Sequence, residues 1–124
     1  MFRAVLNEAI LRRQVGSTAV MATQLGKLIE CARLPNVSIR VSSFSTGMHW
    51  GALSGPFMLL AFPPGRDGTP EPPVVCVDDM LGASYLHEEK LTVRYAAAYN
   101  EIWAAALSER ASVTLMAEAM KEWK

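Results

Sequence analysis

The sequence predicts an α+β fold, and two observations carry that prediction. Helical and strand-like segments follow the order β–α–β–β–β–β–α–α, so strands cluster between helices. Hydrophobic residues make up 51% and charged residues 19% of the 124 residues, which is enough for a real core in one domain. We expect a mostly antiparallel sheet of about four strands, packed by one helix from the N-terminal half and two C-terminal helices. Residues 1–124 are expected to form a single domain.

The first third of the chain predicts two strands around a helix. Residues 2–11 alternate as a strand does, although the last three could equally begin a helix. Ser17 is a good N-cap, and hydrophobic residues recur after it at helical spacing until the helix must end before Pro35. Residues 37–42 alternate again and predict a half-buried strand.

The middle of the chain predicts a long loop and then a buried strand. Residues 44–56 form a Gly- and Ser-rich loop of about 13 residues, and loops of that length are often functional. Residues 57–62 are apolar on both faces, which predicts a central and fully buried strand.

Two further strands are expected after this one. Five prolines and two glycines in residues 63–73 predict an exposed hairpin excursion. Residues 74–77 predict a strand that Asp78 and Asp79 break, and residues 83–86 predict the last strand. Adjacent aspartates point to opposite faces of a strand, so we interpret this pair as a turn that accepts backbone hydrogen bonds rather than as a metal site.

The C-terminal third predicts two helices. Helical character begins near His87, and Ser108 caps the final helix. Each helix has one apolar stripe: Leu91, Tyr95, Ala98, Ile102 and Ala105 on the first, and Val113, Met116, Ala117, Met120 and Trp123 on the second.

The charge of the chain is balanced overall but unequal along its length. Twelve basic residues match twelve acidic ones, whereas nonspecific nucleic-acid binders normally carry a basic excess. Residues 1–62 carry a net charge of +4 and residues 63–124 a net charge of −4, which would favour attraction within the molecule or between copies. Nucleic-acid contact by the modest basic set is a weaker alternative; that set is Arg12, Arg13, Arg33 and Arg40.

Cysteine and leader patterns indicate an intracellular protein without cofactors. Cys31 and Cys76 have no nearby partner at metal-ligand spacing, so we expect two small buried, reduced side chains and no metal. No membrane-spanning run and no signal peptide are evident, and a cytoplasmic location follows.

Short motifs in a fixed order give the chain a family resemblance from about Phe2 to about Met120. These motifs are VLNEAILRR, QLGKLIECARLPNV, FSTGMHWGALSGPFMLLAF, PPVVCVDDMLGASYL and RYAAAYNEIWAAALS. Together they resemble the second half of the C-terminal regulatory domain of actinobacterial, antitoxin-like helix-turn-helix transcriptional regulators. The resemblance implies a non-enzymatic regulatory or interaction domain, whose gene often neighbours that of a small partner protein.

The chain departs from that family in two ways. It starts where the family's second half starts, without the helix-turn-helix or a preceding Leu-Leu-Gln-Thr motif. We therefore expect a truncated relative, a fragment or a standalone protein, and no direct DNA binding by this chain alone. It also has Val41-Ser42-Ser43-Phe44 where the family commonly has Leu-Pro-Phe, so the entry to the long loop is less rigid.

The long loop holds the most functional-looking cluster, Met48, His49 and Trp50. Such side chains beside glycine can bind a ligand or a partner peptide. The simpler interpretation is a loop that folds over the core, with the Trp50 side chain packed into it. A hydrolase built on His49 is kept as a contrast, because no Gly-x-Ser-x-Gly elbow accompanies it.

The first C-terminal helix carries aromatic residues on one face. Tyr95, Tyr99 and Trp103 recur every four residues, which suits core packing or an interface with a second copy or a small partner.

These features give one leading hypothesis and one alternative. The leading hypothesis is protein–protein contact, through a homodimer or a small cognate partner, made by Met48, His49, Trp50, Tyr99 and Trp103. The alternative is a small-molecule sensor whose pocket lies between the sheet and the 44–56 loop, lined by Phe44, Trp50, Phe57 and Tyr85.

Overall fold

The computed structural model describes residues 1–49 and 54–124, and these form two compact units. The first unit holds Met1–Met48 and Ile102–Lys124, and the second holds His49–Glu101. Both contain helix and strand, so the predicted α+β class is confirmed. Among the described residues the strands lie in two sheets, and the prediction of one sheet of about four strands is wrong. The single domain expected over residues 1–124 stays a prediction.

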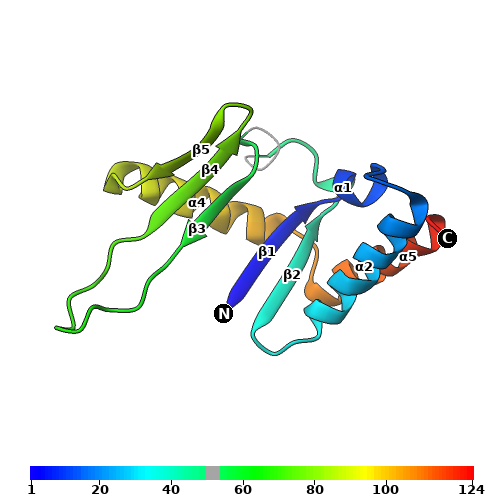
Figure 1. Ribbon diagram of the computed structural model, residues 1–124, viewed down its shortest axis with the longest axis horizontal. Helices are drawn as coiled ribbons and strands as arrows, with labels where there is room; N and C mark the ends of the chain where they lie inside the picture. The colour runs from blue at the N-terminus through cyan, green and yellow to red at the C-terminus, as the bar shows by residue number, and fades with distance from the viewer. Residues whose placement is uncertain (50–53) are drawn as a thin grey trace. The chain divides into compact units, whose positions relative to one another are not determined.

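A two-stranded parallel sheet belongs to the first unit (Figure 1). β1 (Phe2–Asn7) pairs with β2 (Val37–Ser42), with Phe2 opposite Val37 and Asn7 opposite Ser42. Parallel neighbours need a crossover of about a dozen residues or more, and the helical segment between these strands supplies it. The expected antiparallel pairing is therefore wrong here, because side-chain alternation indicates which face is buried but not the direction of the neighbouring strand.

The helices of the first unit are α1 (Ala9–Arg12), α2 (Thr18–Ala32) and α5 (Glu109–Glu122). Both predicted serine caps are confirmed: the Ser17 hydroxyl accepts the Val20 amide at 3.2 Å, and the Ser108 hydroxyl accepts the Ala111 amide at 3.1 Å. Each satisfies an amide that the first helical turn would otherwise leave without a partner.

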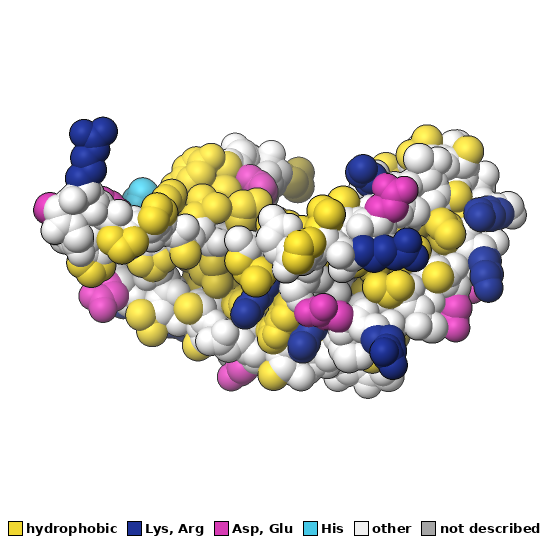
Figure 2. All heavy atoms as spheres, turned by 90° about the horizontal axis from the view of Figure 1, so that it is seen from below, with side chains coloured by type: hydrophobic (Ala, Val, Ile, Leu, Met, Phe, Trp, Pro, Cys, Tyr) yellow, Lys and Arg dark blue, Asp and Glu magenta, His cyan; other side chains and the backbone are white. Residues whose placement is uncertain are grey.

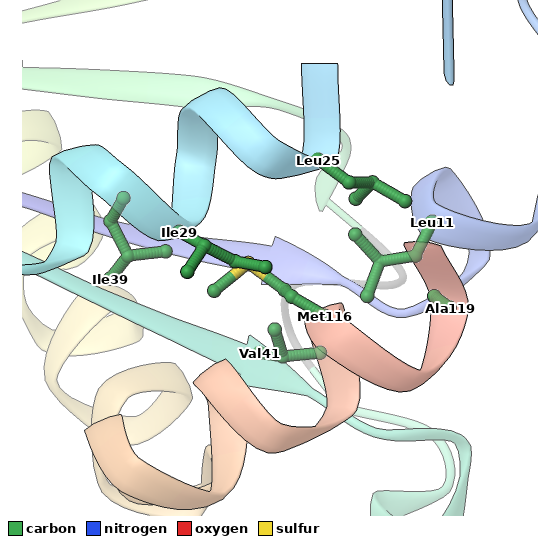
Figure 3. Packing of buried hydrophobic residues seen from close by; sticks show 7 residues of the cluster. All are labelled: Leu11, Leu25, Ile29, Ile39, Val41, Met116 and Ala119. Carbon is green, nitrogen blue, oxygen red and sulfur yellow. The ribbon is translucent and has the colours of Figure 1, made fainter. Parts of the chain in front are cut away.

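α2 and α5 pack against each other and against β2, and they enclose the core of this unit (Figure 3). The buried side chains of this cluster are Leu11, Leu25, Ile29, Ile39, Val41, Met116 and Ala119. Figure 3 shows Met116 reaching from α5 between Ile29 of α2 and Val41 of β2. The helical stripes that the sequence predicts for α2 and α5 therefore meet on one face of the parallel sheet.

The second unit is a three-stranded antiparallel sheet followed by a long helix (Figure 1). Its elements are β3 (Phe57–Leu60), β4 (Val74–Asp79), β5 (Gly82–Leu86) and α4 (Glu89–Ala105), whose last turn belongs to the first unit. The Phe57 and Tyr95 rings meet edge to face, with centroids 5.0 Å apart, and so place α4 on the Phe57 face of the sheet. Residues 63–73 connect antiparallel neighbours, which confirms the predicted hairpin excursion.

Two expectations for this sheet are wrong. The apolar run from residue 57 predicts a central, fully buried strand, but the order β3-β4-β5 makes β3 an edge strand with Met58 54% exposed. β4 also continues through Asp78 and Asp79, because both residues pair with β5. The predicted turn role of the pair is confirmed for Asp79, whose carboxylate accepts the Leu81 amide at 2.8 Å.

Candidate functional site

The loop after β2 carries part of the predicted contact cluster. A 3-10 turn, η1 (Phe44–Thr46), ends at Gly47, whose φ of +75° suits a residue without a Cβ. Met48 follows with 75% exposure, and His49 is half-buried. Trp50 lies outside the described residues. Of the two described members of this cluster, Met48 has the exposure that suits contact with a partner.

The aromatic residues of α4 make different contacts along its length. Tyr95 packs on Phe57, whereas Trp103 is stacked by the Arg40 guanidinium, whose central carbon lies 4.3 Å from the ring centroid. Tyr99, between them in sequence, is half-buried. Tyr95 and Trp103 thus have intramolecular packing partners, while their role in contact with another protein stays a prediction.

A groove of about 440 Å³ opens on the first unit beside Trp103. It is lined by Met1, Arg3, Ala32, Arg33, Leu34, Pro35, Val37, Ser38, Arg40, Trp103 and Glu109. Arg3 and Arg40 point to the sheet face opposite the core, because they alternate with the core residues of β1 and β2. None of the described residues of the 44–56 loop lines this groove, so it does not match the pocket that the sequence predicts.

The structure divides the basic residues that the sequence groups together. Arg33 and Arg40 line the groove, whereas Arg12 hydrogen-bonds Glu122 and reaches Glu8 at 3.4 Å. The hydrogen bond to Glu122 raises the pKa of Arg12 above its usual value, which keeps this side chain charged. Sequence reasoning omits Arg3, because only the register of β1 against β2 brings it beside Arg40.

The sheet of the second unit presents one apolar face to solvent. Met58, Cys76 and Tyr85 lie directly opposite one another across the three strands. Side-chain alternation places Leu60, Val74, Ala83 and Asp78 on the same side of the sheet. We call its apolar core the outer face: Met58, Leu60, Val74, Cys76 and Tyr85. Tyr85 is 60% exposed, and Figure 2 shows hydrophobic side chains, prolines included, gathered over this unit.

The same register separates two residues of the predicted ligand pocket. Phe57 faces α4, whereas Tyr85 lies on the outer face. They are therefore on opposite sides of one sheet and do not line a common cavity.

Residues with metal-binding or nucleophilic chemistry are dispersed. Among residues 1–49 and 54–124, no three His, Cys, Asp or Glu side chains lie close enough to hold a metal ion. Cys31 and Cys76 are free and half-buried, so they are less buried than the sequence predicts. The Ser43 hydroxyl pairs with that of Ser45 at 2.7 Å.

In the part of the chain that the structure describes, no helix is both long and apolar enough to cross a bilayer.

A comparison with protein families decides which family the chain belongs to. The model of DUF5753, described as a domain of unknown function, matches residues 1–118. The chain belongs to the DUF5753 family. No curated protein and no solved structure matches it.

The DUF5753 match covers nearly the same stretch as the motifs that resemble the regulators' C-terminal domain. Membership of DUF5753 brings no activity or partner with it. The link to helix-turn-helix regulators therefore stays a prediction, and function has to be argued from the groove and the outer face.

Proposed function

We propose that this DUF5753 chain is a non-enzymatic regulatory domain that acts through protein–protein contact, either with a second copy or with a small cognate partner protein. The outer face of β3–β5 is the observation that carries this proposal. Met58 and Tyr85 are both more than half exposed on that face, and they are neighbours across β4 rather than scattered singly. Contiguous exposed apolar surface of this kind is typical of a protein contact site.

The thin core of the second unit supports the same proposal. Among its described residues Val75 is the one buried hydrophobic side chain, whereas nine belong to the first unit. A single sheet packed on one side by a helix gains little from burial, and a partner on the outer face would give it a second layer.

The charges of the two units support contact between copies. The first unit carries nine basic and five acidic side chains, and the second carries three basic and seven acidic ones. Their net charges are therefore +4 and −4, and opposite charge favours encounter between unlike units of two molecules.

The residues expected to make the contact include those from the sequence, namely Met48, His49, Trp50, Tyr99 and Trp103. We add Met58 and Tyr85 from the outer face. Met48 and the two added residues are more than half exposed, so they are available without rearrangement.

The first prediction tests the outer face directly. Purified chain, alone and coexpressed with any small protein encoded beside its gene, should run as a homodimer or as a complex in size-exclusion chromatography with light scattering. Met58→Ser and Tyr85→Ser should each weaken that association about tenfold or more, because each removes an apolar side chain that the contact would bury.

The matched control is Val93→Ser. Val93 is 59% exposed on α4 of the second unit and lies outside the outer face, so its replacement should leave the association unchanged. A chain that stays monomeric and takes no partner, or an association equally weakened by all three variants, contradicts the proposal.

A further inference from the structure

The groove of the first unit gathers three arginines without a matching set of acids. Arg3, Arg33 and Arg40 all line it, and among the described residues none of the three makes an ion pair. Glu109 is the acidic side chain of the lining, and it accepts a hydrogen bond from Ser38. The side chains of the lining therefore carry a net charge of +2, and two of the three arginines, Arg3 and Arg40, lie on the sheet face opposite the core.

Arg40 is positioned by the protein but leaves most of its donors unused. Its guanidinium stacks on Trp103 and donates one hydrogen bond from Nη1 to the Trp103 carbonyl at 3.3 Å. A guanidinium has about five N–H donors in a fixed fork that suits oxyanions. The Arg40 Nε is buried and has no hydrogen-bond partner, so the protein alone leaves this group unsatisfied.

Arg3 adds a second guanidinium to the same ring. Its central carbon lies 5.4 Å from the Trp103 ring centroid, compared with 4.3 Å for Arg40. The two arginines are diagonal neighbours across the strand pair, because Arg3 lies opposite Ser38 and Arg40 lies opposite Val5. Two like charges held beside one indole repel each other, and a bound anion would relieve that repulsion.

The charge and size of the groove define the class of anion. A net charge of +2 matches a phosphomonoester, which carries about −1.5 to −2 at neutral pH, better than a carboxylate of charge −1. A volume of about 440 Å³ lies within the range of small-molecule sites and leaves room for an organic group beside the phosphate.

We propose that the groove is a binding site for a small organic phosphomonoester, whose phosphate is held by Arg3 and Arg40 beside Trp103. Trp103 lines this groove and is also among the residues expected to contact a partner. The phosphate proposal rests on Arg3 and Arg40 of the first unit, whereas the protein contact rests on the outer face of the second, so different variants test the two proposals.

The second prediction tests this site by calorimetric titration of the full chain with ribose 5-phosphate, inorganic phosphate, ribose and succinate. Ribose 5-phosphate should bind more tightly than inorganic phosphate, and ribose should not bind. Binding should weaken about tenfold in Arg40→Gln and several-fold in Arg3→Gln, because each variant removes a charged donor to the phosphate. It should also weaken as salt is raised.

The control is Arg110→Gln, an equal change of charge on exposed α5 surface outside the groove lining, which should bind like the parent chain. Arg3 is itself exposed, so Arg3→Gln keeps the test informative if Arg40→Gln fails to fold. A second reading comes from the indole N–H signals in ¹H–¹⁵N spectra, with that of Trp103 assigned by Trp103→Phe. The Trp103 signal should move with ribose 5-phosphate, and that of Trp123, whose indole donates to the Leu11 carbonyl at 2.8 Å, should not.

Three results would overturn the proposal. One is the absence of any phosphate binding at ligand concentrations up to about 10 mM, which is well above the dissociation constant of an ordinary specific site. Another is succinate binding as tightly as ribose 5-phosphate, which would replace the phosphate class with a carboxylate. The third is phosphate binding that Arg3→Gln and Arg40→Gln leave unchanged, or that Arg110→Gln weakens equally.

Discussion

At the scale of single residues, Ser112 supplies a hydrogen bond to the edge of β2 that is not paired with β1. Its side chain is fully buried, and its hydroxyl accepts the Val41 amide at 2.8 Å, while the Leu107 amide donates to the Val41 carbonyl at 3.0 Å. The backbone groups of Val41 that point away from β1 are therefore satisfied by α5 and by the segment that joins it to α4. The buried Val41 amide requires a hydrogen-bond acceptor, which explains why a serine lies on the buried face of α5.

The third prediction follows from that contact. Ser112→Ala leaves the buried Val41 amide without an acceptor, so the free energy of unfolding should fall by about 1–3 kcal/mol. Thr114→Ala, on an exposed position of the same helix, is the control and should change stability by about 0.5 kcal/mol or less. Urea unfolding followed by circular dichroism measures both, and equal effects of the two variants would show that the Ser112 hydroxyl is dispensable.

At the scale of elements, the contact between α2 and α5 depends on Met116. This side chain is fully buried and lies between Ile29 and Val41, so it touches both the facing helix and the sheet (Figure 3). Its flexible thioether can fill the irregular space between a helix pair and a twisted strand pair. The apolar stripe at helical spacing on α5 predicts its burial, but not its neighbours.

The fourth prediction concerns this packing. Met116→Ala should lower the free energy of unfolding by about 2–5 kcal/mol, because it removes buried contacts and leaves a cavity. Val20→Ala on α2 is the control, since Val20 is 54% exposed and alanine favours the helix. Thermal and urea unfolding measure the stability of both variants. An equal free energy of unfolding for Met116→Ala and Val20→Ala would contradict this role of Met116.

The sequence predicts most elements of this chain but not how they pair. Serine caps, helical stripes and the proline-rich excursion mark α2, α5 and the β3–β4 hairpin, because these signals are local in the chain. The parallel direction of β1 and β2 and the edge position of β3 depend on contacts between distant segments. The apolar run of β3 is open to solvent at Met58, whereas such a run normally indicates burial on both faces.

The candidate sites depend still more on tertiary pairing. Met48 and Trp103 can be singled out from the sequence, because one lies in the long Gly-rich loop and the other on the aromatic face of a predicted helix. Arg3 does not, because a single arginine near the start of a strand carries no signal. It becomes part of a groove only when β1 lies beside β2 and α4 brings Trp103 against both arginines.

At the scale of the whole molecule, the two units differ in how much they bury. Nine hydrophobic side chains are buried in the first unit, and among the described residues of the second only Val75 is. Backbone hydrogen bonds over a thin core open at lower free energy than those over a thick one. The second unit should therefore be the less protected part of an isolated molecule.

The fifth prediction is a difference in amide hydrogen exchange. By mass spectrometry, peptides from β3 to β5 of the isolated chain should exchange at least about tenfold faster than peptides from α2, β2 and α5. A partner bound to the outer face should slow exchange in β3 to β5 without changing that of α2, which serves as the internal reference. Equal protection of the two units in the isolated chain would contradict this.

The sequence by itself determined the α+β class, the places of most helices and strands, and the family resemblance. It could do so because capping, periodicity and turn chemistry act between residues close in the chain. Only the tertiary structure decided that β1 and β2 run parallel, that β3 is an edge strand, and that Arg3 and Arg40 flank one indole. Those features arise from contacts between residues up to about a hundred positions apart, such as Arg3 and Trp103, and no local pattern records them.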